Sequence, residues 1–434
     1  MKISVIGTGY VGIISAVGWA GLGNDVVCID VDKAKIDKIN KGIPPIYEVG
    51  LEKRLSESIK SGKLRGVSDY SSIRDSDIVL ISVGTPSADD GSMDTKYIGS
   101  AAESIAKELA KTDRFITITV RSTVVPGTTE RVVGKTIEDL TGKKPGKDFG
   151  LSMIPEFLKE GTALEDFDKP DRIVIGVSDH KARSVLEKLH EAVICPKLFT
   201  DIKTAEMIKY ASNSFLATKV SFTNEIAGIC EGMGIDVDEV MKGAGLDSRI
   251  GPKFLVAGAG FGGSCFPKDV KALIHRAKEG KARTTLLDSV MEVNMRQQTR
   301  LVDMLRGRMP LKGKRVAVLG LAFKENTDDV RESSSIPTIA ALLADGAVVT
   351  AYDPQGMENM TRIYPAIQYA KGWADCLDRC DAALLITAWP EFRKGAKEYK
   401  EMLGNAPLFD ARRILPADDA KKAGLEYHCI GRGR

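Results

Sequence analysis

The sequence predicts an α/β protein in which two doubly wound parallel-sheet domains are joined by a helical central domain with a long connecting helix. Short apolar runs alternate with helical stretches through the first half of the chain, which is the pattern of successive βαβ units. Long helical stretches replace these signals over residues 200–308, and the alternation returns after residue 314. We therefore expect domains at residues 1–199, 200–310 and 311–434, as the length of 434 residues allows.

The first domain is predicted from apolar runs with helical stretches between them. Strands are expected at residues 3–6, 26–30, 78–83, 115–120 and 173–177, with a helix at 11–22. Because helices fill the intervals, the strands would form a mostly parallel sheet. Such sheets bind ligands at the carboxyl ends of their strands.

The first strand runs into a glycine motif with the spacing G-x-G-x-x-G, formed by Gly7, Gly9 and Gly12. Glycines there allow a tight turn, close approach of the backbone to a pyrophosphate, and close packing of helix on strand. Asp30 ends the second strand, where a carboxylate would bind both ribose hydroxyls and repel a 2′-phosphate. We therefore predict a Rossmann-like domain that prefers NAD to NADP, although two nearby lysines weaken the preference.

Two loops after predicted strands place hydroxyl groups over this cofactor site. Residues 82–86 include Thr85, and residues 121–127 include Ser122 and Thr123. Serine and threonine in turns also serve simply to cap or turn the chain, so that reading stays open for each loop.

The central domain is expected to be helical over residues 204–232 and 284–308. Lys209 and Asn213 stand four residues apart in the first helix and so share one face. An ammonium and an amide placed together could stabilise a developing oxyanion. A solvated lysine and a capping asparagine would explain the same spacing.

A glycine-rich stretch at residues 260–269 presents Cys265 among glycines, with Lys268 three residues on. Reactive cysteines need a partly exposed, electropositive setting that stabilises the thiolate. Taken alone, a structural cysteine in a glycine-rich loop is the alternative. The other six cysteines and the four histidines are dispersed along the chain, so we expect neither a disulfide framework nor a metal site.

In the third domain, strands are expected at residues 315–319, 347–352, 382–386 and 407–410. Its first turn carries Phe323 and Lys324 in place of the glycine motif, so the domain could bind a nucleotide other than NAD. Arg412 and Arg413 follow the last strand, where guanidinium groups could grip a diphosphate or a base. Ordinary surface arginines are the alternative.

The charge is nearly balanced, with 62 basic and 59 acidic residues and a formal net charge of +3. This balance gives no reason to expect nucleic acid or a membrane surface as a partner. No apolar run is long enough to span a bilayer, and a core strand stands where a signal peptide would begin. We therefore expect a cytoplasmic protein.

Together, these motifs resemble the UDP-glucose/GDP-mannose dehydrogenase family over nearly the whole chain. The motifs that fall in the family's order are residues 7–12, 122–124, Pro155-Glu156-Phe157-Leu158 with Glu160, Lys209 with Asn213, the cysteine loop with Lys268 and Asp269, Phe323-Lys324, and 331–333. Residues 248–251 and 409–413 are similar to the UDP-glucose branch, although Ala411 stands where that branch often has glycine.

The resemblance implies a four-electron oxidation of a primary alcohol to a carboxylate, with two NAD and one water consumed. Cys265 would capture the aldehyde as a thiohemiacetal and then form a thioester. The lysine and asparagine of the helix would stabilise oxyanions, an aspartate and a threonine would hold water, and a glutamate would assist hydrolysis. The implied catalytic residues are Cys265, Lys209, Asn213, Asp269, Thr123 and Glu156.

Motifs and resemblance together also assign binding residues. Those assigned to the cofactor NAD are Gly7, Gly9, Tyr10, Val11, Gly12, Asp30, Lys35, Thr85, Ser122, Glu160, Lys268 and Arg331. Those assigned to the UDP-sugar substrate are Phe157, Leu158, Arg249, Phe254, Leu255, Gly260, Phe261, Gly262, Phe323, Lys324 and Arg412. Arg249 would reach in from a partner subunit, so a homodimer is expected.

Three alternatives stay open. The same chemistry could act on GDP-mannose or on a UDP-N-acetylhexosamine. A single-step hydroxyacid dehydrogenase shares the N-terminal fold and a Lys/Asn pair, but it has no use for Cys265 or for a second nucleotide domain. A non-enzymatic nucleotide-binding scaffold would be expected to have lost a reactive position, and each of the six is present.

Overall fold

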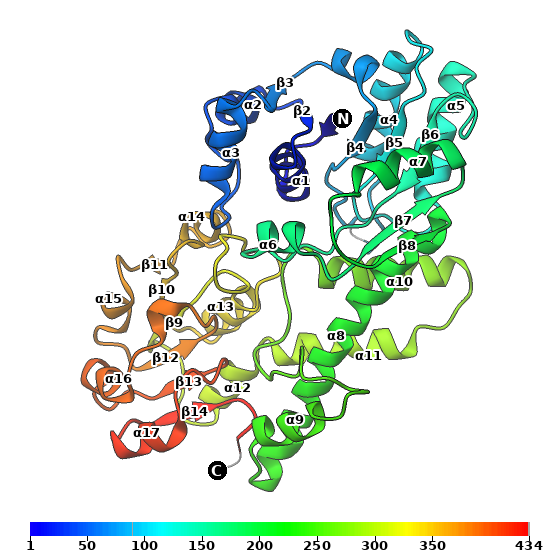
Figure 1. The fold of residues 1–434 in the computed structure, drawn as a ribbon. Coiled ribbons are helices and arrows are strands. Elements are labelled where there is room, and N and C mark those ends of the chain that lie inside the picture. The colour runs from blue at the N-terminus through cyan, green and yellow to red at the C-terminus, as the bar shows by residue number, and fades with distance from the viewer. Residues whose placement is uncertain (89, 433–434) are drawn as a thin grey trace. The chain divides into compact units, whose positions relative to one another are not determined.

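The structure is a computed structural model that describes residues 1–88 and 90–432. The chain forms two compact units, Met1–Ser212 and Asn213–Arg434 (Figure 1). Each unit contains its own sheet, so the predicted α/β fold with two parallel-sheet domains and a long helix is confirmed.

The first unit contains an eight-stranded sheet in the order β3-β2-β1-β4-β5-β6-β7-β8. The strands are β1 (Lys2–Ile6), β2 (Asp25–Ile29), β3 (Leu64–Val67), β4 (Ile78–Ile81), β5 (Thr117–Val120), β6 (Gly150–Met153), β7 (Ile173–Val177) and β8 (Lys197–Thr200). Neighbouring strands are parallel except β6 and β7, which are antiparallel. The first six strands have the order of a doubly wound nucleotide-binding sheet.

The core of this unit lies on both faces of the sheet, because side chains alternate along each strand. In β1, Ile3 and Val5 pack with α1, whereas Ile6 joins the cluster that includes α4. The helices are α1 (Tyr10–Gly21), α2 (Lys33–Asn40), α3 (Leu51–Lys60), α4 (Lys96–Leu109), α5 (Lys135–Thr141), α6 (Ala163–Asp168) and α7 (His180–Leu189), with a π-helix at Thr129–Gly134.

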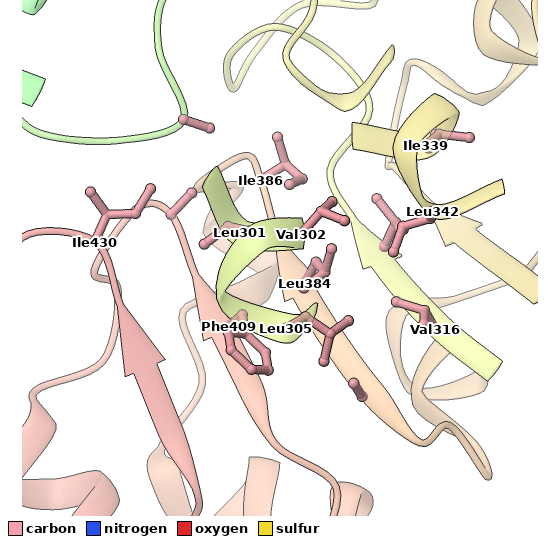
Figure 2. Packing of buried hydrophobic residues seen from close by; sticks show 14 of the residues in the cluster. Leu301, Val302, Leu305, Val316, Ile339, Leu342, Leu384, Ile386, Phe409 and Ile430 are labelled. Atoms are coloured by element: carbon pink, nitrogen blue, oxygen red, sulfur yellow. The ribbon is translucent and has the colours of Figure 1, made fainter. Parts of the chain in front are cut away.

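The second unit contains a parallel six-stranded sheet in the order β11-β10-β9-β12-β13-β14. The strands are β9 (Arg315–Leu319), β10 (Val348–Tyr352), β11 (Gln368–Tyr369), β12 (Ala382–Leu385), β13 (Leu408–Asp410) and β14 (Tyr427–Cys429). Figure 2 shows Leu301, Val302 and Leu305 of α12 (Arg300–Arg306) over one face of this sheet. They pack in one buried cluster with Leu384 and Phe409.

The remaining helices of the second unit surround this sheet or form the segment before it. They are α9 (Val237–Gly245), α10 (Phe266–Glu279), α11 (Thr285–Gln297), α13 (Ser335–Ala344), α14 (Met357–Thr361), α15 (Trp373–Leu377), α16 (Ala396–Leu403) and α17 (Ala417–Lys422).

The long helix α8 (Ile202–Met233) begins in the first unit and ends in the second. It matches the helix predicted at residues 204–232. The single helix predicted at residues 284–308 is wrong, because the chain turns at Gln298 and Thr299 and forms α11 and α12 instead. Within the described residues, no helix is both long enough and apolar enough to cross a membrane.

Candidate active site

The glycine motif forms a tight turn at the start of α1. Gly7 has a φ of +88°, and a Cβ atom there would lie 2.7 Å from the Ser82 carbonyl oxygen. A Cβ on Gly12 would lie 1.9 Å from the Gly7 carbonyl oxygen, so both positions exclude side chains. By contrast, a Cβ built on Gly9, the N-cap of α1, would meet no described atom within 4 Å beyond its own residue and chain neighbours. The turn therefore fits a dinucleotide pyrophosphate, whose charge the helix N-terminus would stabilise.

Asp30 lies beside this turn, directly after β2. Its Oδ2 accepts hydrogen bonds from the Thr8 amide at 2.8 Å and the Thr8 hydroxyl at 2.6 Å, and its Oδ1 accepts one from the Asp32 amide at 3.0 Å. Burial raises the pKa of the Asp30 carboxyl, but these bonds outweigh burial and leave the pKa below its usual value. A charged carboxylate with lone-pair capacity left on Oδ1 suits a ribose hydroxyl. Lys35 also lowers this pKa by its charge.

The two predicted hydroxyl loops hold one another. The Ser122 hydroxyl donates to the Val83 carbonyl at 2.7 Å, and the Thr85 hydroxyl donates to the Thr123 carbonyl at 3.0 Å. The second of these loops, which contains Ser122 and Thr123, is anchored at its end by the buried Glu206 of α8. Glu206 accepts hydrogen bonds from the Gly127 and Thr129 amides. Sequence reasoning missed Glu206, since its partners lie more than 70 residues away.

Glu156 and Lys209 form a buried ion pair in the first unit. The Lys209 Nζ lies 3.0 Å from Glu156 Oε1, and the two side chains are 4% and 5% exposed. Glu156 Oε2 accepts from the Leu158 amide at 2.7 Å. Burial raises the pKa of the Glu156 carboxyl, but the charge and hydrogen bond of Lys209, the Leu158 amide and the Arg121 charge together lower it. The Phe157 ring lies beside the pair, with Lys209 Nζ 5.4 Å from its centroid.

Cys265 is the N-cap of α10 in the second unit. Its carbonyl accepts from the Asp269 amide at 2.9 Å, and its Sγ lies 3.6 Å from the Ser264 hydroxyl. The N-terminus of this 14-residue helix is a setting that stabilises negative charge. The sequence prediction relied on Lys268 for this electropositive setting and missed the helix terminus, although Pro267 in the first turn is a signal for it.

Asp269 gathers two of the predicted site residues around one buried carboxylate. Its Oδ2 accepts from Asn213 Nδ2 at 2.6 Å, and its Oδ1 accepts from Lys268 Nζ at 2.7 Å. Asp269 is 1% exposed and Asn213 is 5% exposed. A carboxylate held in this way, four residues after the cysteine, can accept a proton or orient a water molecule.

The glycine-rich cysteine loop packs against the Phe323 segment, which belongs to the same unit. A Cβ on Gly263, whose φ is +82°, would lie 2.8 Å from the Phe323 ring, and one on Gly262 would lie 2.1 Å from the Glu332 carbonyl oxygen. The Gly263 amide donates to the Arg331 carbonyl at 3.0 Å. Close approach of the Glu332 backbone therefore requires glycine at position 262, and close approach of the Phe323 ring requires it at position 263.

Asn294 of α11 holds the same loop, and sequence reasoning missed it. Its Oδ1 accepts from the Phe261 amide at 2.7 Å, and its Nδ2 donates to the Phe261 carbonyl at 3.0 Å. Gly260 has a φ of +88°, and a Cβ there would lie 2.6 Å from Asn294 Oδ1. Just before this loop, Phe254 adopts a φ of +66°, a left-handed conformation that is strained for a bulky side chain, and Leu255 is buried.

The second sheet lacks an equivalent of Asp30 for a ribose. Asp353 follows β10 at the corresponding place, but it is fully buried. Its carboxylate accepts hydrogen bonds from the amides of Leu321, Ala322, Gln355 and Gly356 and from the indole of Trp389. These five donors occupy the acceptor sites of the Asp353 carboxylate, so none is left for a ribose hydroxyl. Asp353 instead stabilises the turn that leads to Phe323 and Lys324.

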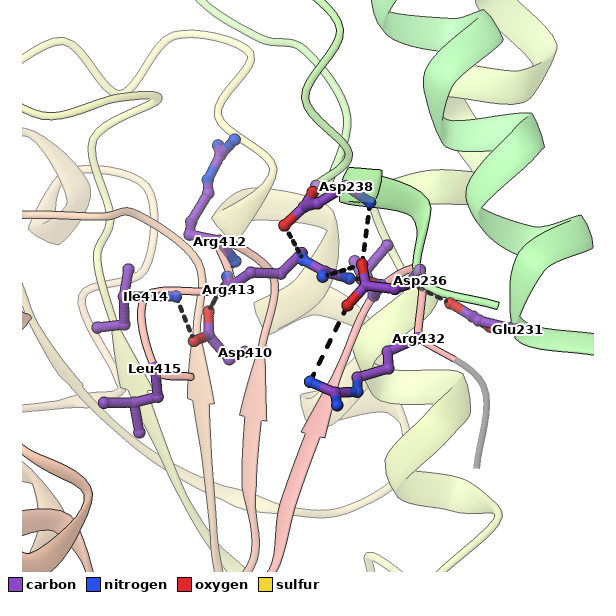
Figure 3. A network of polar contacts seen from close by, with 12 residues as sticks. Glu231, Asp236, Asp238, Asp410, Arg412, Arg413, Ile414, Leu415 and Arg432 are labelled. Carbon is purple, nitrogen blue, oxygen red and sulfur yellow. Dashed lines mark hydrogen bonds and ion pairs between the residues drawn. The ribbon is translucent and has the colours of Figure 1, made fainter. Parts of the chain in front are cut away.

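The two arginines after β13 have different roles (Figure 3). Arg413, with a φ of +54°, donates to Asp238 at 2.8 Å, to Asp236, and to the Ile430 carbonyl at 3.0 Å, so its guanidinium is committed within the unit. Arg412 points away from these two aspartates, and its Nε donates to the Ile386 carbonyl at 2.6 Å. Of the two, Arg412 is therefore the better placed to meet a ligand.

Two other predicted arginines lie on the surface. Arg249 pairs with Asp247 in its own turn, and its side chain is 87% exposed. Arg331 pairs with Asp329 and is 65% exposed. In the described part of the chain, no group of three or more histidine, cysteine, aspartate or glutamate residues could hold a metal ion.

Comparison with known proteins covers nearly the whole length of the chain. Residues 1–194 match the NAD binding domain of the UDP-glucose/GDP-mannose dehydrogenase family, residues 203–296 its central domain, and residues 317–417 its UDP binding domain. UDP-glucose 6-dehydrogenase AglM of Haloferax volcanii is 44% identical, with 99% of this chain and 100% of that protein covered. UDP-glucose 6-dehydrogenase TuaD of Bacillus subtilis is 41% identical, with 99% of this chain and 93% of that protein covered.

A solved structure gives the same result. The UDP-glucose dehydrogenase of the hyperthermophilic archaeon Pyrobaculum islandicum superposes with a TM-score of 0.92 at 38% identity, over 99% of this chain and 98% of that one. The glycine turn and Asp30 fit the dinucleotide that the matched first domain binds. This chain therefore belongs to the UDP-glucose/GDP-mannose dehydrogenase family and is an NAD-dependent enzyme.

Proposed function

We propose that this enzyme oxidises UDP-glucose to UDP-glucuronate through thiohemiacetal and thioester intermediates on Cys265. The observation that carries the proposal is Cys265 at the N-cap of α10, four residues before a buried Asp269 that binds Asn213 and Lys268. An enzyme that stopped at the aldehyde would have no use for such a thiol. The relatives named for UDP-glucose make this sugar nucleotide the first candidate.

In the first oxidation, C6 of the sugar loses a hydride and its hydroxyl loses a proton. Bound NAD would accept one hydride in each of the two oxidations. Asp269 and Thr123 are each proposed to hold or activate water for proton transfer. The Cys265 thiolate would then add to the aldehyde carbon, forming a C–S bond and turning the carbonyl oxygen into an alkoxide.

Lys209 and Asn213 would stabilise that alkoxide until the second hydride leaves and a thioester forms. Water would then add to the thioester carbon, with Glu156 assisting as general acid or base, and the C–S bond would break to return the thiolate. In total, one alcohol, one water and two NAD would give one carboxylate, two NADH and three protons.

We also propose the division of labour among the domains. Residues 1–199 would bind NAD, residues 200–310 would supply the cysteine and the dimer contact, and residues 311–434 would bind the UDP moiety through Phe323, Lys324 and Arg412. This role is supported by Asp410, whose carboxylate holds the Arg412 backbone by accepting from its amide at 2.7 Å. The other cofactor and substrate contacts are those assigned from the motifs.

A homodimer is the third part of the proposal. Phe215, Phe222 and Ile229 follow one another at seven-residue intervals on α8, and they are 66%, 55% and 52% exposed. Apolar residues with this spacing form one stripe along a helix, which a second copy of the helix could cover. The exposed Arg249 would then serve the partner's site.

The proposal is tested by counting the NADH formed per sugar nucleotide consumed by the purified protein. UDP-glucose, GDP-mannose and UDP-N-acetylglucosamine should be run in parallel. Two NADH per UDP-glucose are expected. One NADH would mean release at the aldehyde and would remove the thioester, whereas two from another sugar alone would correct the substrate and keep the mechanism.

A further inference from the structure

Glu48 is a buried carboxylate in the loop between α2 and α3 that the proposed mechanism does not use. It is 6% exposed. Its Oε1 accepts from the Ala163 amide at 2.8 Å, and its Oε2 accepts from the Gly161 amide at 2.7 Å and from the Tyr10 hydroxyl. A buried charge is costly unless hydrogen bonds stabilise it, so a carboxylate held by three donors indicates a specific role.

The donors belong to two segments far apart in the sequence. Tyr10 is the first residue of α1, directly after the dinucleotide turn. Gly161 and Ala163 end the loop that follows β6, and the Gly161 amide also lies 3.2 Å from the Tyr10 hydroxyl. Glu48 therefore joins the beginning of α1 to the end of the loop at residues 154–162.

That loop carries four of the predicted site residues and is held at several points. At its beginning, the Ile154 amide donates to the Val120 carbonyl at 2.9 Å. In its middle, Glu156 pairs with Lys209. At its end, Gly161 adopts a φ of +85° and donates to Glu48. Glu48 is thus the anchor between the loop's end and the dinucleotide turn.

We propose that Glu48 is a positioning residue that sets the loop at residues 154–162 against α1 and thereby places Glu156 for thioester hydrolysis. The catalytic part of this inference rests on the proposed function. The chemistry requires a carboxylate rather than an amide, because both oxygens accept backbone N–H donors. In Glu48→Gln the side-chain NH₂ would face one of these N–H groups, so an anchor would be lost without a change in size.

The test compares Glu48→Gln with Glu52→Gln, an exposed glutamate on α3, as the matched control. In Glu48→Gln we expect kcat with UDP-glucose to fall about tenfold to a hundredfold, the range for a small misplacement of a catalytic group, with little change in KM. Hydrolysis would become limiting, so two NADH per subunit should form in a burst and the acyl group should accumulate on Cys265, as intact mass would record. A purely structural defect would not produce that acyl adduct.

A second readout separates this inference from the proposed function. Hydrogen exchange should be faster at the Gly161 and Ala163 amides in Glu48→Gln than in Glu52→Gln. A wild-type enzyme that oxidised no UDP-glucose would overturn the proposed function. Hydrogen exchange at the Gly161 and Ala163 amides would then still test whether Glu48 anchors the loop. Equal exchange rates in Glu48→Gln and Glu52→Gln would show that Glu48 does not anchor the loop. An unchanged kcat with no acyl adduct in Glu48→Gln would show that Glu48 does not position Glu156.

If Glu48→Gln does not fold, Tyr10→Phe takes its place. It removes one of the three hydrogen bonds and leaves both backbone bonds, so a smaller fall in kcat with the same adduct is expected. An unchanged kcat and no adduct in Tyr10→Phe would overturn the proposal.

Discussion

At the scale of single residues, the first unit is organised around three buried glutamates that hold loops in place. Glu48, Glu156 and Glu206 are each less than 10% exposed, and each accepts at least one backbone N–H. Only Glu156 is paired with a lysine. Burial raises the pKa of Glu206 despite its hydrogen bonds, whereas the lysine helps to keep the pKa of Glu156 low. The pairing with Lys209 therefore distinguishes Glu156 from Glu206.

The proposed nucleophile gives the most direct test at this scale. In Cys265→Ser we expect NADH formation from UDP-glucose to fall by more than about a thousandfold. A neutral serine hydroxyl is a much weaker nucleophile than the cysteine thiolate that it replaces. Circular dichroism and NAD titration should match the wild type, since Cys265 is not among the residues assigned to NAD. Cys195→Ser, at a half-buried cysteine of the first unit, is the control. Full activity in Cys265→Ser would remove the covalent mechanism.

A buried histidine predicts how stability depends on pH. Burial, together with the charges of Arg121 and Lys197, lowers the pKa of His190 to about 4. An unfolded histidine titrates near 6.5, so the unfolded state binds the proton first as the pH falls. Stability should therefore decrease from pH 6.5 to about pH 4, by roughly 3 kcal/mol from this residue, and its contribution should then level off.

Urea unfolding between pH 7 and pH 4 measures this effect. In His190→Leu the decline over that window should be smaller than in the wild type, whereas the exposed His180→Leu should leave it unchanged. An identical pH dependence in wild type and His190→Leu would contradict the prediction.

At the scale of elements, strands rich in apolar residues were predictable, and short mixed ones were not. The strand predicted at residues 315–319 matches β9, because four of its five residues are buried and apolar. β6 reads Gly-Leu-Ser-Met and β8 reads Lys-Leu-Phe-Thr, and neither shows an apolar run. Their pairing partners, rather than their own composition, make them strands.

The residues of the candidate site likewise divide into those that the sequence could predict and those that it could not. The glycine turn and Asp30 could be predicted, because the spacing of the glycines reflects local backbone geometry. Asn294 and Glu48 could not, because Asn294 lies 33 residues from Phe261 and Glu48 lies 113 residues from Gly161. A polar residue that supports a distant loop has no local pattern of its own.

Substitution of Asn294 tests how strongly α11 holds the cysteine loop in place. Asn294→Ala would leave the Phe261 amide and carbonyl without their partner, at a cost of about 1–3 kcal/mol for a buried group. We expect KM for UDP-glucose to rise about tenfold, with a smaller change in kcat, as steady-state kinetics would measure. Glu292→Ala, at an exposed position of the same helix, should behave as wild type. An unchanged KM in Asn294→Ala would mean that the loop is held by its other contacts.

At the scale of the whole molecule, the surface of the second unit carries two exposed features that the proposed dimer would use. The stripe of Phe215, Phe222 and Ile229 exposes apolar rings and a branched side chain along α8. The guanidinium of Arg249 extends into solvent apart from its pair with Asp247 in the same turn. Lys219 of α8 donates to the Ile250 carbonyl at 3.1 Å and so fixes this turn to the helix that bears the stripe. Both features are explained if a second copy binds along α8.

Mixed dimers test this explanation, because each inactive variant would supply what the other lacks. Cys265→Ser and Arg249→Ala should each be inactive or nearly so. If Arg249 acts in the partner's site, a dimer of one variant with the other has one complete site, formed by the Cys265 of the Arg249→Ala subunit and the Arg249 of the Cys265→Ser subunit. Random exchange would make half of the dimers mixed, so about a quarter of wild-type NADH formation should return. If Arg249 acted in its own subunit, or if the protein were monomeric in sedimentation, mixing would restore nothing.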